Sequence, residues 1–570
     1  MPTICLNMIV RNEAHIIREA LDSVAPYITS WVIVDTGSDD GTQALIKRHM
    51  ADLDIPGELH ERPWHNFGHN RTEALHLAKG HGDYILMMDA DDKLVGTPDF
   101  SQLSADIYAL RITLGVDVYW RPHLFRDQAR VRYEGVTHEC ATWDETYSYD
   151  RLQGDYHIEA RTLGGRNLDP RKYERDRDLL LAEVERNPAD SRSVFYLAQS
   201  YFDLGDFVNA QKWYAQRTKM GGFVEEVYYA LFRVALCMSN LGTPWPDVQD
   251  AYLKAWNFRP TRAEPLYFIA LWYRRNQEYQ LGYLFAKLAT EIPFPTQERL
   301  FVGADIYTWC AADERAVCAS WIGKRAEAFT LWRQLLAQAD IPDQDRQRIT
   351  KNRDLCVPAM IDMAAPYPDT ALVQRLIAYN RAHRQRGPRE VEVTVSLISG
   401  PDLQSTERTL NSFLRCCTDI TRVGRFLVLD VGLSAQDRAA LMDRYRFVEL
   451  THTDSTQETK DQIAHLRTQI NGRFWMHLSQ GWQFFAPENF IGRLIAVLQA
   501  EPQVFQVGVN FADATRLIGV TAPENVVRRA PDTGRYVLTT MVAHGPAMYD
   551  LNRPNQATAS LDEVLCITGL

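Results

Sequence analysis

The sequence predicts a three-part chain in which two α/β domains flank a helical repeat domain. Short apolar segments alternate with amphipathic segments over residues 1–165, which is typical of a parallel sheet covered by helices. Over residues 166–385 the strand-like alternation gives way to helical patterns that recur roughly every 35 residues. Over residues 386–570 the first alternation returns in the same order. These ranges are the predicted domains.

The first domain is predicted to carry its acidic residues along one edge of its sheet. Apolar strands are expected at 3–10, 31–34, 57–61 and 84–88, and helices at 16–24, 42–50 and 70–77. The carboxyl ends of parallel strands meet at one edge, where open α/β sheets bind ligands. The strand ends are followed by Asp35, Asp39 and the acids of 89–92.

Asp89 and Asp91 are the strongest chemical signal in the chain, because they follow directly on a buried strand. Carboxylate oxygens suit Mg²⁺ or Mn²⁺ and, through the metal, a diphosphate. An acidic surface turn is the plain alternative. The turn at 11–13 reads Arg-Asn-Glu and lacks both the Gly-x-Gly-x-x-Gly and the Walker pattern. A metal-bridged phosphate therefore fits better than a backbone cradle.

Three motifs together resemble the family-two GT-A glycosyltransferases: Asn7 to Glu13, Val34 to Thr42, and Asp89-Ala90-Asp91. The resemblance implies a nucleotide-sugar donor, with a UDP-sugar expected, and Mn²⁺ or Mg²⁺ as the cofactor. It places Asp35 against the nucleotide base with Asp39 beside it, and Arg71 near the diphosphate. Asp89 then contacts the nucleotide sugar and Asp91 is a metal ligand. Inversion at the anomeric carbon is also implied by the resemblance.

Residues 124–126 (Leu-Phe-Arg) and 133–139, which end in His-Glu, resemble the closing element of a soluble subgroup of that family. Arg126 is assigned to the nucleotide sugar. His138 is predicted to be a metal ligand or a phosphate contact, and a satisfied structural histidine is its alternative. Glu139 is the predicted general base. Other acids in the same stretch remain open for that role: Asp106, Asp117, Asp144 and Glu145.

Composition excludes several classes of protein. A net charge of −11 and a pI near 5.8 argue against nonspecific nucleic-acid binding. No secretory signal begins the sequence, and no apolar run of about 18 residues could span a bilayer. The nine cysteines lack Cys-x-x-Cys spacing, so neither a disulfide framework nor a zinc site is indicated. A cytoplasmic protein with reduced thiols is expected.

The middle region has the pattern of tetratricopeptide repeats, in which large and small side chains alternate at helical spacing. Such repeats stack into a solenoid whose face can bind an acceptor polypeptide or a partner subunit. The partner subunit could be a second copy of this chain, so homo-oligomerisation is one expectation. The middle copy is broken at 243–246 (Thr-Pro-Trp-Pro). Glu225 and Glu226 are expected to be solvated. The aromatic side chains are expected to be core rather than carbohydrate-stacking: Trp213, Tyr214, Trp256, Tyr267, Trp272 and Tyr273.

The third domain reads as a degenerate copy of the first, preceded by a linker at 384–389. Asp430 stands where Asp35 stood, but Ser479-Gln480-Gly481 replaces the Asp-x-Asp motif. Loss of both acids removes the metal ligands, so we predict a catalytically silent module that binds a glycan, braces the solenoid or mediates dimerisation. The rival interpretation is that another acid substitutes: Glu449, Asp454 or Glu488.

The leading functional hypothesis is therefore a metal-dependent glycosyltransferase acting on a cytosolic acceptor. The first domain resembles the catalytic half of bacterial peptide S-glycosyltransferases, which also join GT-A and tetratricopeptide parts. This resemblance favours a peptide or protein acceptor over a glycan or lipid-linked one. A non-catalytic tetratricopeptide scaffold with vestigial sugar-nucleotide folds is the alternative from another class. A nucleotidylyltransferase is less favoured, because its Gly-rich, Arg-containing loop is absent after the first strand.

Overall fold

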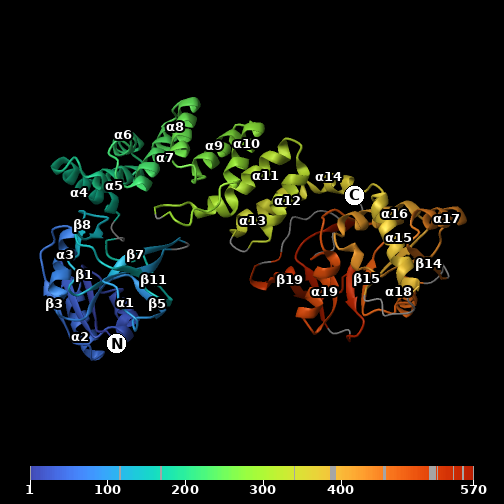
Figure 1. Ribbon diagram of the computed structural model, residues 1–570, viewed down its shortest axis with the longest axis horizontal. Coiled ribbons are helices and arrows are strands. Elements are labelled where there is room, and N and C mark those ends of the chain that lie inside the picture. Colours follow the sequence, from blue (N-terminus) through green and yellow to red (C-terminus); the bar gives the residue numbers. More distant parts are fainter. Residues whose placement is uncertain are drawn as a thin grey trace. The chain divides into compact units, whose positions relative to one another are not determined.

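The chain groups into two compact units. The computed structural model describes residues 2–114, 117–166, 170–298, 300–338, 341–385, 393–453, 458–511, 522, 524–543, 545–554 and 557–568. Unit 1 comprises Met1–Ile269 and Ile292–Ala304, and unit 2 comprises Ala270–Glu291 and Asp305–Leu570. The helical region at 166–385 is thus divided between the units, and the α/β regions belong to different units (Figure 1).

Unit 1 begins with a mixed sheet whose order is β3-β2-β1-β4-β7-β6-β11-β5, with β10 paired to β6. Strands β1 to β4 are parallel, and β7 pairs antiparallel with β4. The strands are β1 (Ile4–Val10), β2 (Ser30–Asp35), β3 (Gly57–Glu61), β4 (Tyr84–Met87), β5 (Lys93–Pro98), β6 (Ile107–Leu114), β7 (Asp117–Arg126), β10 (Tyr149–Arg151) and β11 (Gly154–Glu159). A short ribbon joins β8 (Arg132–Glu134) to β9 (Cys140–Thr142).

Helices cover both faces of this sheet, as the apolar strands predicted. The helices are α1 (Ile17–Val24), α2 (Thr42–Asp52) and α3 (Phe67–Ala78). Leu6 and Met8 of β1 pack in one apolar cluster with α1 and α2, whereas Cys5 packs in another with α3. Successive side chains of a strand point to opposite faces, so the central strand β1 is buried on both sides.

Paired helices follow the first sheet. They are α4 (Lys172–Arg186), α5 (Ser191–Asp203), α6 (Phe207–Arg217), α7 (Val224–Asn240), α8 (Trp245–Phe258), α9 (Glu264–Arg275), α10 (Tyr279–Thr290), the π-helix η2 (Ile306–Cys310), α11 (Ala311–Trp321), α12 (Arg325–Leu336), α13 (Asp343–Asp354), α14 (Val357–Ala364) and α15 (Thr370–Gln385). The break at 243–246 is the turn between α7 and α8, with Pro244 as the N-cap. Of the six aromatic residues named above, Tyr214 and Tyr273 are buried, which confirms that they are core, and the other four are partly exposed.

One prediction about the helical region is wrong. Glu225 and Glu226 are buried at 7% and 3% exposure rather than solvated. Glu226 accepts hydrogen bonds from Arg217, which is itself fully buried. Burial of a carboxylate is tolerated when a cation is paired with it, and the partners of these two glutamates are distant in sequence.

Unit 2 contains a second sheet with the order β14-β13-β12-β15-β20-β17-β21-β19-β18, and a two-stranded sheet β16-β22. Its first four strands are again parallel, and β20 pairs antiparallel with β15. The strands are β12 (Val393–Ser399), β13 (Arg425–Asp430), β14 (Val448–His452), β15 (Phe474–Leu478), β16 (Trp482–Phe484), β17 (Val504–Gly508), β18 (Arg528–Ala530), β19 (Gly534–Thr539), β20 (Ala547–Asp550), β21 (Ala557–Leu561) and β22 (Cys566–Thr568). The predicted strands were therefore found in the predicted order.

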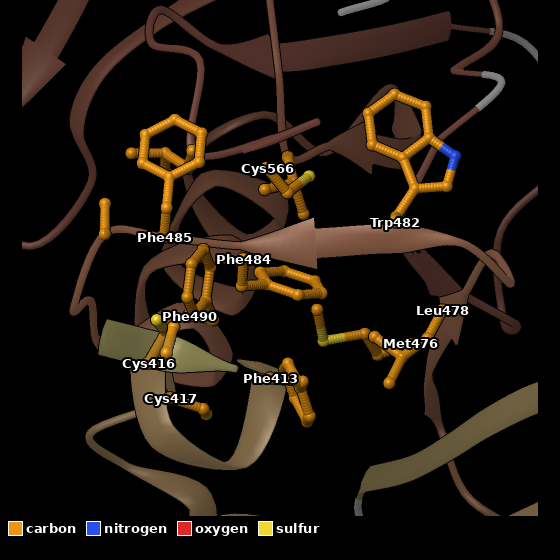
Figure 2. Packing of buried hydrophobic residues seen from close by; sticks show 14 of the residues in the cluster. Phe413, Cys416, Cys417, Met476, Leu478, Trp482, Phe484, Phe485, Phe490 and Cys566 are labelled. Carbon is orange, nitrogen blue, oxygen red and sulfur yellow. The ribbon is translucent and has the colours of Figure 1, made fainter. Parts of the chain in front are cut away.

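Four helices and an aromatic core complete this part of unit 2. The helices are α16 (Leu403–Cys416), α17 (Ala435–Arg444), α18 (Thr459–Thr468) and α19 (Phe490–Ala500). Figure 2 shows the rings of Phe413, Phe484 and Phe490 packed together, with centroids 5.1 Å apart for Phe413–Phe484 and 5.2 Å for Phe484–Phe490. The predicted linker at 384–389 falls largely outside the described residues, since only 384 and 385 of it are described, at the end of α15.

The cysteines and helices agree with two exclusions made from composition. All nine cysteines lie among the described residues and none is in a disulfide. In the part of the chain that the structure describes, no helix has the length and apolar character needed to cross a membrane.

His477 is expected to make the stability of unit 2 fall in acid. Its Nδ1 lies 2.9 Å from the Ser396 hydroxyl, and burial lowers its pKa from 6.5 to about 4. Between these two pKa values the unfolded chain binds a proton that the folded chain excludes. The free energy of unfolding therefore decreases as the pH falls from about 6.5 to 4, by up to about 3 kcal/mol from this group.

Urea unfolding at pH 7 and at pH 4.5 tests this effect, since His477→Asn should lose less stability between the two pH values than the wild type. The exposed His76, replaced in the same way, serves as the control. Equal pH dependence in the wild type and His477→Asn would contradict the expectation.

Candidate functional site

The ends of β1, β2 and β4 lie side by side in unit 1, as the parallel pairing requires. Asp35 closes β2 and is almost fully buried. Its Oδ1 accepts three hydrogen bonds, from the backbone N–H groups of Gly37 and Ser38 at 2.9 Å each and from the Gln43 amide at 3.0 Å. Its Oδ2 is buried with no hydrogen-bond partner among the described residues. Because an unpaired buried carboxylate oxygen is costly, Oδ2 is suited to accept a hydrogen bond from a ligand.

Asp39 lies in the loop beyond the same strand and is exposed. Its backbone N–H donates to the Asn12 side chain at 2.9 Å, which ties the loops after β1 and β2 together. The structure therefore places Asp39 at the rim of this edge, beside Asp35.

Arg71 links two of the predicted site residues. It lies in the second turn of α3, whose N-cap Asn66 accepts from the backbone N–H of His69 at 2.8 Å. Its Nε donates to Glu139 Oε1 at 2.6 Å, and its Nη2 donates to Asp89. Burial alone would raise the pKa of Asp89, but the charge and hydrogen bond of Arg71 outweigh it and hold that pKa at about 2. Asp89 is therefore ionised at neutral pH.

The neighbouring carboxyl groups are less well neutralised. Burial raises the pKa of Asp91 and of Asp92, and the charge on Asp89 raises both further. Burial raises the pKa of Glu13 to about 7, and the charge on Asp91 adds to the effect. The backbone N–H of Gly164 donates to Asp91 Oδ2 at 2.8 Å, and that of Gly165 lies 3.2 Å from both Glu13 oxygens. These raised pKa values report chiefly the burial of the carboxyl groups, with repulsion between neighbouring carboxylates as a further cause.

A divalent cation fits this charge distribution, although the side chains alone do not form a complete metal site. Among the described residues, no group of three or more histidine, cysteine or acidic side chains could hold an ion. Mg²⁺ commonly takes one or two carboxylates and completes its shell with phosphate oxygens and water. Asp91, next to the ionised Asp89, suits that arrangement.

His138 is held against the helical region rather than beside Asp91. Its backbone has a φ of 52°, which is left-handed for a non-glycine residue. Its ring stacks on Tyr196 of α5 with centroids 4.2 Å apart, and its carbonyl accepts from Arg192 Nη2 at 2.9 Å. Burial first, and then the charge of Arg166, lower the pKa of His138 to about 4, so the imidazole is neutral at pH 7. Its cationic surroundings favour a phosphate contact over a metal ligand.

The structure does not bring Arg126 close to the acids that follow β4. Arg126 pairs with Tyr84 in the antiparallel register of β7 and β4, which is the opposite end of β4 from Asp89. Five residues of strand separate the two ends, or roughly 16 Å. The Arg126 side chain pairs with Asp106 at 2.9 Å and lies over the Tyr84 ring. Arg126 therefore lies away from the other residues that were predicted to bind the nucleotide sugar.

Arg121, at the other end of the same register, was missed by the sequence reasoning. The register pairs Tyr84 with Arg126 and Leu86 with Leu124, so β7 runs from Arg126 toward the end of β4 that precedes Asp89, and the charge of Arg121 acts on Asp89. Arg121 keeps part of its surface exposed, and the charges of Asp89, Tyr119 and Glu139 raise its pKa. No local sequence pattern singled out Arg121, because its interaction with Asp89 depends on how β7 pairs with β4.

His123 fixes this end of β7, because its Nδ1 lies 2.7 Å from the carbonyl of Met87. Burial, followed by the Arg121 charge, lowers the pKa of His123 to about 4.

The alternative general bases are engaged elsewhere. Asp106 accepts from Ser148 and pairs with Arg126, and Asp144 pairs with Arg132 at 2.7 Å. Glu145 accepts from the Tyr147 hydroxyl at 2.7 Å. The side chain of Asp117 lies outside the described part of the chain. Glu139 is the predicted base that the structure brings next to Asp89, through Arg71.

The corresponding edge of the unit 2 sheet is filled by its own side chains. Asp430 Oδ1 accepts from the backbone N–H groups of Gly432 and Leu433, as Asp35 does in its loop. However, Asp430 Oδ2 is occupied by Arg438 Nε at 2.6 Å. The Gln480 side chain accepts a hydrogen bond from the backbone N–H of Gly400 at 3.0 Å and donates one to the Thr406 hydroxyl at 3.1 Å.

The two rival acids of unit 2 that the structure describes are paired with arginines and do not replace the missing acids. Glu449 pairs with Arg425 at 2.7 Å, and Glu488 pairs with Arg493 at 2.7 Å. Asp454 lies outside the described residues.

Comparison with known proteins agrees with the motifs of unit 1. The model of the family described as Glycosyl transferase family 2 matches residues 5–96. A TPR repeat-containing protein of Synechococcus elongatus is 30% identical over 263 residues, which cover 42% of this chain and 63% of the relative. The chain thus spans less than two thirds of that relative's length. Residues 5–96 therefore match the family-two model, as the motifs of this part predicted, and the paired helices α4–α15 follow them in the chain.

Two solved structures give only weak likenesses. The crystal structure of MamA has a TM-score of 0.24 at 14% identity, and the matched region covers 29% of this chain and 87% of the MamA chain. The crystal structure of S. aureus TarS has a TM-score of 0.24 at 13% identity, and it covers 44% of this chain and 55% of that chain. Neither score is high enough to carry an argument about this chain.

Proposed function

We propose that residues 1–165 are a metal-dependent glycosyltransferase domain that moves a sugar from a nucleotide donor, preferably a UDP-sugar, to a polypeptide acceptor in the cytoplasm. The observation that carries the proposal is the unpartnered Oδ2 of Asp35 on the same sheet edge as the charge-rich carboxyl groups of residues 89–92. The match of residues 5–96 to family-two glycosyltransferases supports the reaction class.

Each residue has a definite task in this proposal. Asp35 Oδ2 accepts an N–H of the nucleotide base. Arg71 holds Asp89 ionised, and Arg121, whose charge also acts on Asp89, receives diphosphate oxygens. His138, neutral at pH 7, donates to a phosphate oxygen. Asp91 would hold a Mn²⁺ or Mg²⁺ ion, which neutralises charge on the leaving diphosphate when bound.

Transfer requires one base and one leaving group. The acceptor nucleophile loses its proton to Glu139 as its bond to the anomeric carbon forms. The bond from that carbon to the diphosphate breaks, and the electron pair leaves with the nucleoside diphosphate. Arg71 occupies Glu139 Oε1, so Oε2 is the oxygen that takes the proton. A single displacement of this kind inverts the configuration.

The unit 2 sheet is proposed to be a GT-A-like module that does not bind a donor. Its support is the strand order shared with the first sheet, together with the side chains that fill its Asp430 edge. Arg438 and Gln480 occupy the positions that a nucleotide and diphosphate would need.

Asp35→Asn is the sharpest test of donor binding, because it places an N–H₂ donor where the base N–H would meet an acceptor. We expect UDP, titrated calorimetrically with Mn²⁺, to bind roughly 10- to 100-fold more weakly to the variant than to the wild type. Asp155→Asn, at a fully exposed carboxylate, is the matched control. Absence of metal-dependent UDP binding by the wild type would refute the enzyme and favour a non-catalytic tetratricopeptide scaffold.

A further inference from the structure

One segment of the chain packs away from its neighbours in sequence. Ile292–Ala304 belongs by its contacts to unit 1, although the helices before and after it, α10 and α11, belong to unit 2 (Figure 1). The chain therefore leaves unit 2, contributes this segment to unit 1, and returns. A simple connection between consecutive helices has no need of such a detour.

Charged side chains of the helical region bind the main chain of this segment. Glu225 Oε2 accepts from the backbone N–H of Leu300 at 2.8 Å. Arg262 donates to the carbonyls of Leu300 and Phe301, at 3.3 Å and 2.7 Å. Glu264 Oε1 accepts from the N–H of Gly303 at 3.3 Å. Main-chain groups are common to every polypeptide, so these contacts do not depend on the sequence of the segment.

The three binding side chains are almost completely buried, at 7% exposure for Glu225, 1% for Arg262 and 3% for Glu264. Buried charges are expensive unless they are paired and hydrogen-bonded. Arg262 and Glu264 pair with each other at 2.6 Å. Arg262 also pairs with the Glu298 side chain of the segment at 3.5 Å, and Glu264 also accepts from the Tyr228 hydroxyl at 3.3 Å. The hydrogen bonds to the backbone of the segment are thus part of a larger buried network.

Phe301 is the aromatic anchor of the segment. Its ring centroid lies 4.9 Å from that of Tyr229 and 6.5 Å from that of Phe195. The residue nevertheless keeps 48% of its surface exposed. The backbone of Phe301 has a φ of 42°, a left-handed conformation that costs a non-glycine residue about 1–2 kcal/mol. The contacts therefore hold the segment in a strained form, which a relaxed competitor would not share.

The face formed by Phe195, Glu225, Tyr229, Arg262 and Glu264, here the segment-binding face, is continuous with the candidate site. Phe195 contacts Tyr196 at 5.1 Å, and Tyr196 stacks on His138. A chain bound on this face is thus separated from His138 by two aromatic rings.

We propose that the segment-binding face is a binding site for an extended polypeptide with an aromatic side chain, and that Ile292–Ala304 fills it as a tethered occupant. An incoming polypeptide displaces the segment and uses the same hydrogen bonds. Binding of a polypeptide to this face does not require sugar transfer. That the bound polypeptide is the sugar acceptor rests on the proposed function.

The experiment replaces residues 294–304 by a glycine–serine chain of equal length and adds a fluorescein-labelled peptide with the sequence of residues 294–304. A tethered occupant competes at an effective concentration of about millimolar. We therefore expect the peptide to bind the replaced protein at least about tenfold more tightly than the wild type. The peptide with alanine at the Phe301 position, and Glu225→Gln in the replaced protein, should each weaken binding.

The replaced protein must remain folded by circular dichroism, and its UDP titration reports donor binding separately. No peptide binding by a folded replaced protein would overturn the proposal, even where UDP still binds. Phe301→Ala in the full-length chain is a milder second variant, which should admit the labelled peptide more readily than the wild type. Failure of both variants to fold would show that the segment is part of the core and would also overturn the proposal.

Discussion

Asp91→Asn is expected to reduce metal-dependent donor hydrolysis and transfer by roughly 100- to 1,000-fold, because it removes a charge that holds the cation at the leaving diphosphate. Asparagine keeps the shape of the side chain and an oxygen that can accept from Gly164, which now lies 2.8 Å from Asp91. The measurement is release of nucleoside diphosphate from a UDP-sugar over a range of Mn²⁺ concentrations.

Asp91→Asn should lower activity without lowering the stability of the protein. The pKa of Asp91 is raised by burial and by the Asp89 charge, so a neutral side chain relieves repulsion at neutral pH. The variant should therefore melt at the same temperature as the wild type or higher, in the absence of metal. Asp155→Asn again serves as the control. Undiminished turnover by Asp91→Asn with saturating Mn²⁺ would remove the proposed metal site.

The fold was largely predictable because it depends on local periodicity. Apolar strands ending in acids, separated by amphipathic helices, define both sheets, and local capping residues such as the Asp190 N-cap mark where repeat helices begin. Glu225 and Glu226 show the limit of this reasoning. Their sequence neighbourhood looks like a polar turn, and only tertiary partners 75 and 9 residues away make their burial favourable.

The site was less predictable than the fold. A sequence pattern can show that a segment is a strand, but it does not show which of its residues pair with which residues of the neighbouring strand. Sequence reasoning chose Arg126, which the structure places at the end of β7 away from Asp89. The difference depends on which residue of β7 pairs with which residue of β4. Similarly, Asp35 and Asp430 follow equivalent strands, and only the structure distinguishes an unpartnered Oδ2 from one paired with Arg438.

The contrast between Arg121 and Arg126 yields the second large effect. Both lie on β7 and both are cations, but Arg126 pairs with Tyr84 at the start of β4, whereas the charge of Arg121 acts on Asp89. Arg121→Ala is expected to lower kcat/KM for transfer roughly 100-fold, because a cation facing developing phosphate charge acts mainly in the transition state. Arg121→Lys should recover part of the loss, since it restores the charge without the planar fork.

Arg126→Ala is the matched variant and should change stability rather than catalysis. It loses the pair with Asp106 and the contact with the Tyr84 ring, at a cost of about 1 kcal/mol. Its kcat/KM should stay within about threefold of the wild type, since such a change in folding free energy leaves the folded fraction high. Equal losses of activity in the two variants would mean that the β4–β7 register does not decide which cation serves the donor. A loss confined to Arg121 would assign the diphosphate to the Asp89 end of the sheet.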